Sequence, residues 1–150
     1  MLALDYSLDP ASSRKSGEVD LAKASLEDLR YGLFLGDVYL RDPDAGVDLS
    51  GPWGWVPVLD FALSLKAIVE ALQQEESVRF EFTESEAALD FRRDGDDVEI
   101  AATYAPGIVR LPLRTFRDQV LAFARRVVSE LCTRNLRLAA NPEIRRHMGS

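Results

Sequence analysis

The stretch GPWGWVPVLDFALSLKAIVEAL, residues 51–72, decides the class of fold. Pro57 fits the first turn of a helix, where the N–H that proline lacks would be unpaired anyway. Apolar residues then recur every three or four positions as far as Leu72, which predicts a long amphipathic helix with one broad buried face. Trp53 and Trp55 precede this helix either as a hydrophobic lid or as a platform for a ligand or partner. We favour the lid, because large aromatic residues beside a core helix usually complete the core.

Upstream of this helix, the sequence predicts strands joined by turns. Residues 2–8 (LALDYSL) alternate between apolar and polar side chains, as a half-buried strand does. Residues 32–42 (GLFLGDVYLRD) read as another strand, with Gly36 marking a bulge. Between them we predict a polar loop at residues 11–17, a short strand at residues 18–24 (EVDLAKA) and one helical turn begun by Ser25, with Asp28 three positions on.

Downstream, three alternating segments predict an antiparallel meander: residues 77–84 (SVRFEFTE), 88–93 (ALDFRR) and 97–104 (DVEIAATY). Asp94-Gly95 favours a hairpin turn between the last two, because both residues tolerate a positive φ. The connections are too short for helical crossovers, so neighbouring strands should be antiparallel.

A second long amphipathic helix is expected from near Thr115 to residues 132–134, where Arg134 would otherwise enter the apolar stripe. We therefore predict an α+β fold in which a single antiparallel sheet of about five or six strands carries two long amphipathic helices on one face. Residues 1–150 should form a single domain, with residues from about 134 to 150 as a C-terminal extension or tail. The final Gly-Ser is either native or a cloning remnant.

The charge is unevenly distributed along the chain. The net charge is −7, yet residues 1–100 carry 9 basic and 22 acidic residues, whereas residues 101–150 carry 9 and 3. An acidic body repels phosphate backbones, so a nucleic-acid partner is not expected. The sequence shows no secretory signal and no apolar run long enough for a membrane span, which favours a cytoplasmic protein. With Cys132 as the only cysteine, no intrachain disulfide can form.

Few residues are suited to catalysis. His147 is the only histidine, and it lies in a basic tail, where the rigid placement of a general base is not expected. Cys132 falls at the edge of a helical apolar face and reads as a buried, inert thiol. One histidine and one cysteine do not suffice for a zinc site, and no glycine-rich phosphate loop occurs. We therefore predict a protein that is not an enzyme and that uses no cofactor and no metal.

The helix of residues 51–72, the meander VRFEFTES…ALDFRRDGDDVEIAATY and the closing helix FRDQVLAFARRVVSELC are similar in layout to small bacterial immunity proteins of polymorphic toxin systems. The resemblance implies a binding protein that neutralises a cognate toxin, such as a basic nuclease, through an acidic surface. Ten residues are candidates for partner contacts on this hypothesis: Asp42, Asp44, Asp48, Trp53, Trp55, Glu84, Glu86, Asp94, Asp96 and Asp97.

Two alternatives remain open at this point. The first is a small-ligand-binding or regulatory domain with a pocket near Trp53 and Trp55. The second is a hydrolase whose paired carboxylates, for example Glu84 and Glu86, converge in a cleft. The oligomeric state does not follow from the sequence.

Overall fold

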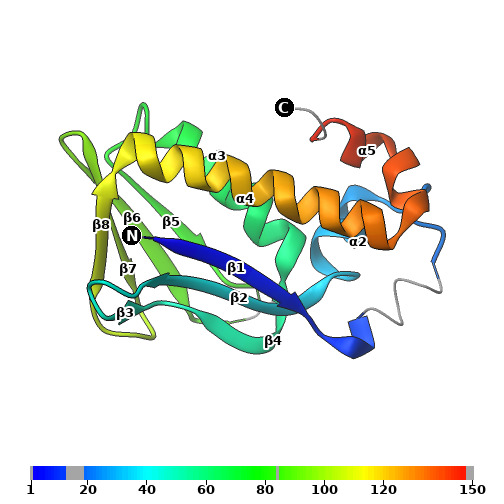
Figure 1. The fold of residues 1–150 in the computed structure, drawn as a ribbon, viewed down its shortest axis with the longest axis horizontal. Coiled ribbons are helices and arrows are strands. Elements are labelled where there is room, and N and C mark those ends of the chain that lie inside the picture. Colours follow the sequence, from blue (N-terminus) through cyan, green and yellow to red (C-terminus); the bar gives the residue numbers. More distant parts are fainter. Residues whose placement is uncertain (1, 13–18, 84, 148–150) are drawn as a thin grey trace.

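The computed structural model describes residues 2–12, 19–83 and 85–147. Its first sheet, which we call sheet A, is built around strand β2 (Leu35–Asp42). Strand β1 (Ala3–Leu8) pairs with one side of β2 in antiparallel orientation. Strands β3 (Val47–Asp48) and β4 (Gly51–Pro57) share the other side (Figure 1). The predicted strands at residues 2–8 and 32–42 are thus confirmed as β1 and β2.

The second sheet, sheet B, is a four-stranded antiparallel meander in the order β5-β6-β7-β8. Strands β5 (Ser77–Glu81), β6 (Ala88–Asp94) and β7 (Asp97–Ala102) confirm the three predicted segments and their orientation. Gly95 has φ +62° in the β6–β7 hairpin, as the Asp-Gly turn predicts. Strand β8 (Ile108–Pro112) completes the sheet and leads directly into a helix.

The prediction of a single sheet is wrong, because the described residues form two four-stranded antiparallel sheets. The break comes at Pro57, where β4 turns into helix α3 (Val58–Ala71) without an intervening loop. When the chain leaves α3 it begins a new ladder with β6 instead of joining an edge of sheet A. The α+β class and the antiparallel pairing are confirmed, while the arrangement in one layer is not.

Helix α3 and helix α4 (Leu113–Arg134) pack against each other and join the two sheets (Figure 1). Helix α4 contacts β1 of sheet A as well as β7 and β8 of sheet B, and α3 contacts β2, β4 and β5. The end of α4 at Arg134 agrees with the end predicted from the apolar stripe. Burial of both apolar faces against two sheets supplies the main driving force for this arrangement.

Aromatic rings fill the space between the helices and sheet B. The ring of Phe61 on α3 packs edge-on against Phe80 and Phe123 and lies parallel to Phe82, with ring centroids 5.6 to 6.2 Å apart. Such contacts add to the burial of apolar area. The two helices and sheet B therefore share one continuous core.

The shorter elements close one end of the molecule. Ser25 accepts a hydrogen bond from the Asp28 amide and caps helix α2 (Leu26–Tyr31), which confirms the predicted helical turn. The short strand predicted at residues 18–24 is wrong, since the described part of it forms a bend and a turn. Of the loop predicted at residues 11–17, residues 11 and 12 belong instead to a short helical turn, and residues 13–17 lie outside the described residues. After α4 the chain continues in a 3₁₀ helix η1 (Leu136–Ala140) and a short helix α5 (Pro142–Arg145).

Within the described ranges, no helix combines the length and the hydropathy needed to cross a membrane. Helix α4, the longest, carries arginines along its exposed side.

Candidate partner-binding surface

Strand β4 departs from the ladder in a wide bulge that contains both tryptophans. Gly36 pairs with Val56 and Val38 pairs with Gly51, so that Asp37 alone stands opposite residues 52–55. The bulge predicted near Gly36 is therefore present, but the extra residues belong to β4. Gly54 adopts a φ of +77°, which other residues rarely tolerate, and this glycine lets the chain turn back into register.

The carboxylate of Asp37 holds the bulge in place. Its Oδ1 accepts a hydrogen bond from the Gly54 amide at 2.8 Å. Its Oδ2 accepts hydrogen bonds from the hydroxyls of Ser7 at 3.1 Å and Tyr39 at 3.2 Å. Hydrogen bonds to a charged acceptor are roughly twice as strong as neutral ones, so this group fixes three strands relative to one another.

The two tryptophans of the bulge are stacked on each other, with ring centroids 5.2 Å apart and planes inclined by 15°. Trp53 is half-buried and packs edge-on against Phe82, which directly follows β5, and against Tyr104, which lies in the β7–β8 connection. Trp55 lies on the outside of the stack and is 39% exposed. The two predicted roles therefore fall to different residues. Trp53 acts as the lid, because it packs against the interior, and Trp55 faces solvent, as a binding platform would.

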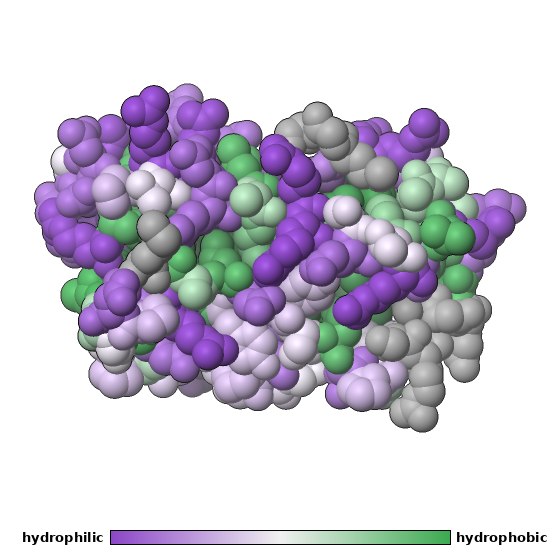
Figure 2. Space-filling view, viewed as in Figure 1, coloured by the Kyte–Doolittle hydropathy of each residue, from purple (hydrophilic) through white to green (hydrophobic). Residues whose placement is uncertain are grey.

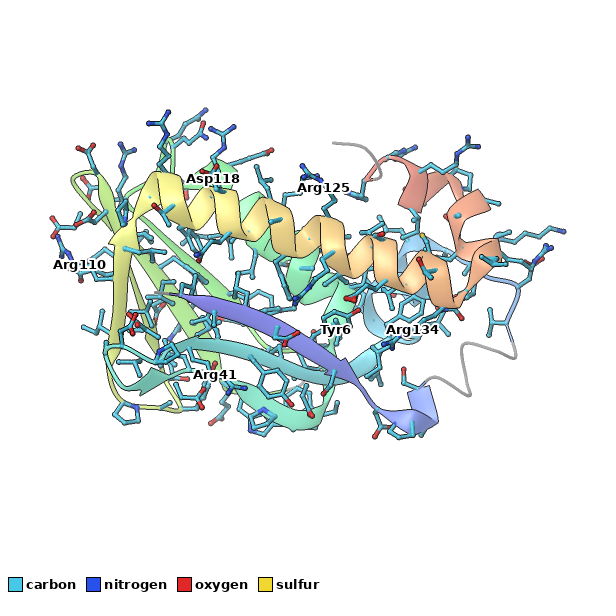
Figure 3. All side chains as sticks on the ribbon, in the orientation of Figure 1. Tyr6, Arg41, Arg110, Asp118, Arg125 and Arg134 are labelled. Carbon is cyan, nitrogen blue, oxygen red and sulfur yellow. The ribbon has the colours of Figure 1, made fainter. Side chains whose placement is uncertain are left out.

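The outer face of sheet A, opposite the helices, continues from this bulge across the polar side of β1 and β2. Arg41 lies over the ring of Tyr39 at 4.7 Å from its centroid, and Figure 3 shows Arg41 projecting from the sheet on the side away from α4. Asp48 is exposed, and hydrogen bonds from Ser50, with the nearby charge of Arg41, lower the pKa of its carboxyl. We call this face, made of Ser7, Asp37, Tyr39, Arg41, Asp48 and Trp55, the tryptophan surface.

The other acidic candidates near the β2–β3 turn differ in their exposure. Asp42 is 9% exposed and accepts a hydrogen bond from the Ala45 amide, so it stabilises the turn. Asp44 lies in the turn and is exposed. Glu86 is exposed in the β5–β6 connection, close in sequence to Phe82, while Glu84 lies outside the described residues.

The acids of the β6–β7 hairpin belong to a different surface. In a meander, the β6–β7 turn is at the opposite end of the strands from the β5–β6 and β7–β8 connections that carry Phe82 and Tyr104. Arg110 bonds to Asp94 at 2.9 Å and to Asp97 at 3.1 Å, which neutralises part of the hairpin. The candidates Asp94, Asp96 and Asp97 are thus not brought together with Trp53 and Trp55.

The residues considered for catalysis are arranged unlike a reactive pair. Cys132 and His147 do line one surface hollow of about 400 Å³. Burial raises the pKa of the Cys132 thiol, whereas burial and the charges of Lys66, Arg30 and Arg146 lower the pKa of His147. Both groups therefore favour their neutral forms, the opposite of a thiolate–imidazolium pair. His147 is half-buried against the end of the described chain, so it is held more firmly than its place in a predicted basic tail implies.

Five surface hollows among the described residues are lined by other side chains. Neither Trp53 nor Trp55 lines any of these five. The described residues also contain no group of three or more histidine, cysteine or acidic side chains placed to hold a metal ion.

Sequence reasoning missed Asp37, Tyr39 and Arg41 as members of this surface. Their common signal is the alternation of polar side chains at every second position of β2, in which Asp37, Tyr39 and Arg41 share one face. Comparison with protein-family models, curated proteins and solved structures finds no match for this chain.

Proposed function

We propose that this chain is a non-enzymatic binding protein that acts in the cytoplasm and neutralises a cognate toxin, like the immunity proteins that its sequence resembles. The observation that carries the proposal is the exposed indole of Trp55, which is stacked on Trp53 in a bulge anchored by Asp37. The tryptophan surface is the contact that we assign to the toxin.

The rigidity of the bulge supports a role in binding. The Trp55 ring stacks on Trp53, which packs edge-on against Phe82, and the Gly54 amide is bonded to Asp37. A side chain that is already ordered loses little conformational entropy when a partner covers it. An exposed aromatic ring held in this way is suited to anchor an interface.

The composition of the tryptophan surface also resembles that of protein interfaces. Trp, Tyr and Arg dominate the residues that contribute most to binding. Here Arg41 lies over Tyr39, and the exposed Trp55 belongs to the bulge that Asp37 of the same strand holds. Asp37 and Asp48 give it negative charge, in keeping with the acidic body of residues 1–100. Acidic charge increases the rate of encounter with a basic partner such as a nuclease.

The test is to isolate the partner by co-purification from the source organism, to express it with and without this protein, and to measure survival and affinity. Trp55→Ala should weaken binding about 30-fold or more, the effect of losing an aromatic anchor. Leu136→Ala is the matched control, because Leu136 is 81% exposed on a different part of the molecule. Equal killing with and without the protein would overturn the proposal, and so would equal affinities of the two variants.

A further inference from the structure

Strand β1 is an outer strand of sheet A, so one row of its backbone groups has no neighbouring strand. The amide of Asp9 donates to the carbonyl of Leu35, which continues the bonds that the odd-numbered residues make to β2. The N–H and C=O groups of Leu4, Tyr6 and Leu8 consequently face outward. A row of this kind is a template for a further strand.

A single ion pair covers the middle of this edge. Arg126 of α4 donates to the outward carbonyl of Leu4 at 3.3 Å and to Asp5 Oδ1 at 2.9 Å. The same Asp5 oxygen accepts the outward amide of Tyr6 at 2.8 Å. The outward amides of Leu4 and Leu8 have no partner among the described residues. The Asp5–Arg126 pair thus protects two backbone groups and leaves the others open.

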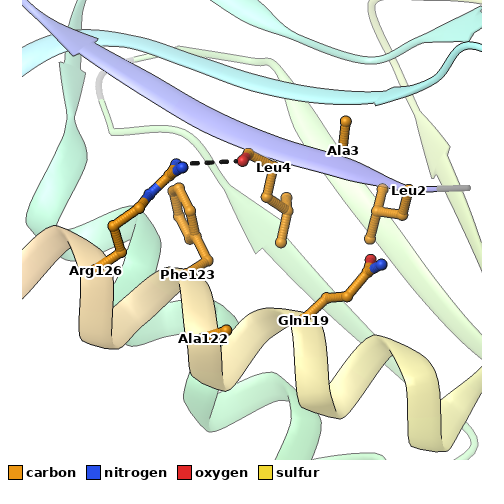
Figure 4. A pocket seen from close by; sticks show the side chains of 7 residues that line it. All are labelled: Leu2, Ala3, Leu4, Gln119, Ala122, Phe123 and Arg126. Carbon is orange, nitrogen blue, oxygen red and sulfur yellow. Dashed lines mark hydrogen bonds between the residues drawn. The ribbon is translucent and has the colours of Figure 1, made fainter.

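Two hollows lie along the same edge, one on each side of Arg126, and α4 forms the opposite wall of both. The first, of about 320 Å³, lies over Leu2, Leu4 and Phe123 (Figure 4). Figure 2 shows an apolar, hollowed patch where β1 and α4 run side by side. The second, of about 350 Å³, extends along β1 from Asp5 to Leu8.

The two hollows favour different side chains. In the first, Gln119 Oε1 is buried and has no hydrogen-bond partner among the described residues, so an incoming N–H group would satisfy it. In the second, Glu130 accepts a hydrogen bond from the Tyr6 hydroxyl at 2.9 Å. Arg134 lines this hollow without a hydrogen bond or ion pair to the described residues, and Figure 3 shows it on the Tyr6 side of α4. An acidic side chain complements it.

We propose that the free edge of β1 receives an extended segment of another polypeptide as an added strand, and that the Asp5–Arg126 pair opens to admit it. Such a segment has an apolar side chain for the hollow beside Phe123 and an acidic one for Arg134. Its backbone bonds to the outward groups of Leu4, Tyr6 and Leu8. A second copy of this chain is a poorer occupant, because its own α4 would meet the α4 that walls this edge.

This site adjoins the tryptophan surface at Ser7 but does not include Trp55, Tyr39 or Arg41, and its test needs no toxin. The probe is a displayed library of random eight-residue peptides, selected on the folded protein and mapped by amide chemical shifts. We expect the bound peptides to shift and protect the amides of Leu4, Tyr6 and Leu8 and to contain an acidic residue and an apolar one.

Two pairs of variants make the test specific. Ala122→Lys fills the first hollow from an exposed position of α4 and should abolish peptide binding, whereas Ala67→Lys makes the same change on the exposed side of α3 and should leave it intact. Asp5→Ala frees the Tyr6 amide and should tighten binding about tenfold. Asp90→Ala removes another exposed strand aspartate paired with an arginine and should have no effect.

Three results would overturn the proposal. One is a selection that yields no binder, and another is a set of binders that map to other residues or tolerate Ala122→Lys. The third is a shift of the inward amides of Ala3, Asp5 and Ser7, which would mean that the peptide displaces β2.

Discussion

Asp37 Oδ1 accepts a hydrogen bond from the Gly54 amide at 2.8 Å. Asp37 is the β2 residue that stands opposite the bulge of β4, so this bond ties the bulge to the neighbouring strand. Asp37→Ala should lower the free energy of unfolding by about 2 kcal/mol, because the amide and two hydroxyls lose a charged acceptor. Urea unfolding followed by tryptophan fluorescence measures the loss. Asp90→Ala, which removes an exposed ion pair, should change stability by less than about 1 kcal/mol.

The two tryptophans should respond differently to truncation. Trp53→Ala should cost about 3 kcal/mol, because it removes the ring that packs against Phe82 and Tyr104. Trp55→Ala should cost less than about 1 kcal/mol, since its ring faces solvent. Equal losses in denaturant unfolding would contradict the division into a bridging ring and an exposed one.

Gly36 is required where β1 crosses close to β2. A Cβ at this position would lie 1.9 Å from the carbonyl oxygen of Ser7, so Gly36→Ala should cost about 3 kcal/mol or prevent folding. Gly32→Ala is the control, because its nearest contact would be an ordinary 3.5 Å. Thermal unfolding of the two variants, followed by circular dichroism, should give a clearly lower midpoint for Gly36→Ala alone.

The ion pair between Arg30 and Asp60, with 2.6 Å between its atoms, joins α2 to α3, and the Asp60 side chain is only 8% exposed. Arg30→Met should cost about 3 kcal/mol, because the buried carboxylate loses its partner. The double variant Arg30→Met with Asp60→Leu should be more stable than the sum of the single losses implies. A double-mutant cycle by urea unfolding measures this coupling.

Tyr6 makes stability depend on alkaline pH. Burial, together with the hydrogen bond to Glu130 and its charge, raises the pKa of Tyr6 to about 12. The contribution of the neutral hydroxyl is therefore complete below about pH 10, the pKa of an unfolded tyrosine, and is lost as the pH rises toward 12. The stability difference between the protein and Tyr6→Phe should shrink over that interval. A constant difference from pH 8 to pH 11 in urea unfolding would contradict this assignment.

Local patterns in the sequence were sufficient for the elements whose side chains repeat regularly. Residues a few positions apart determine three of these features: the apolar stripes of α3 and α4, the alternation of β5 to β7 and the helix cap at Ser25. Strand β4 has no such repeat, because Pro52, Gly54 and Pro57 interrupt it and most of its length is a bulge. The division into two sheets depends on which strands pair at long range, and local alternation does not encode that choice.

The candidate surface was found only in part for the same reason. Trp53 and Trp55 are visible as rare residues in a short stretch, but which of them is exposed depends on Phe82 and Tyr104, far along the chain. Asp37 gains its role from an amide 17 positions away. The acids of the β6–β7 hairpin looked equivalent to those near Trp53, and only the topology of the meander separates them.

The bulge of β4 also separates residues that can change from residues that the pairing with β2 requires. Residues 52–55 lie outside the ladder, while Val56 and Gly51 on either side fix the register against β2. Exchanges at the exposed positions Pro52 and Trp55 leave the strand pairing intact, whereas Trp53 and Gly54 hold the bulge in its shape. The chemistry of this exposed insert can therefore vary while the scaffold of paired strands around it is inherited unchanged.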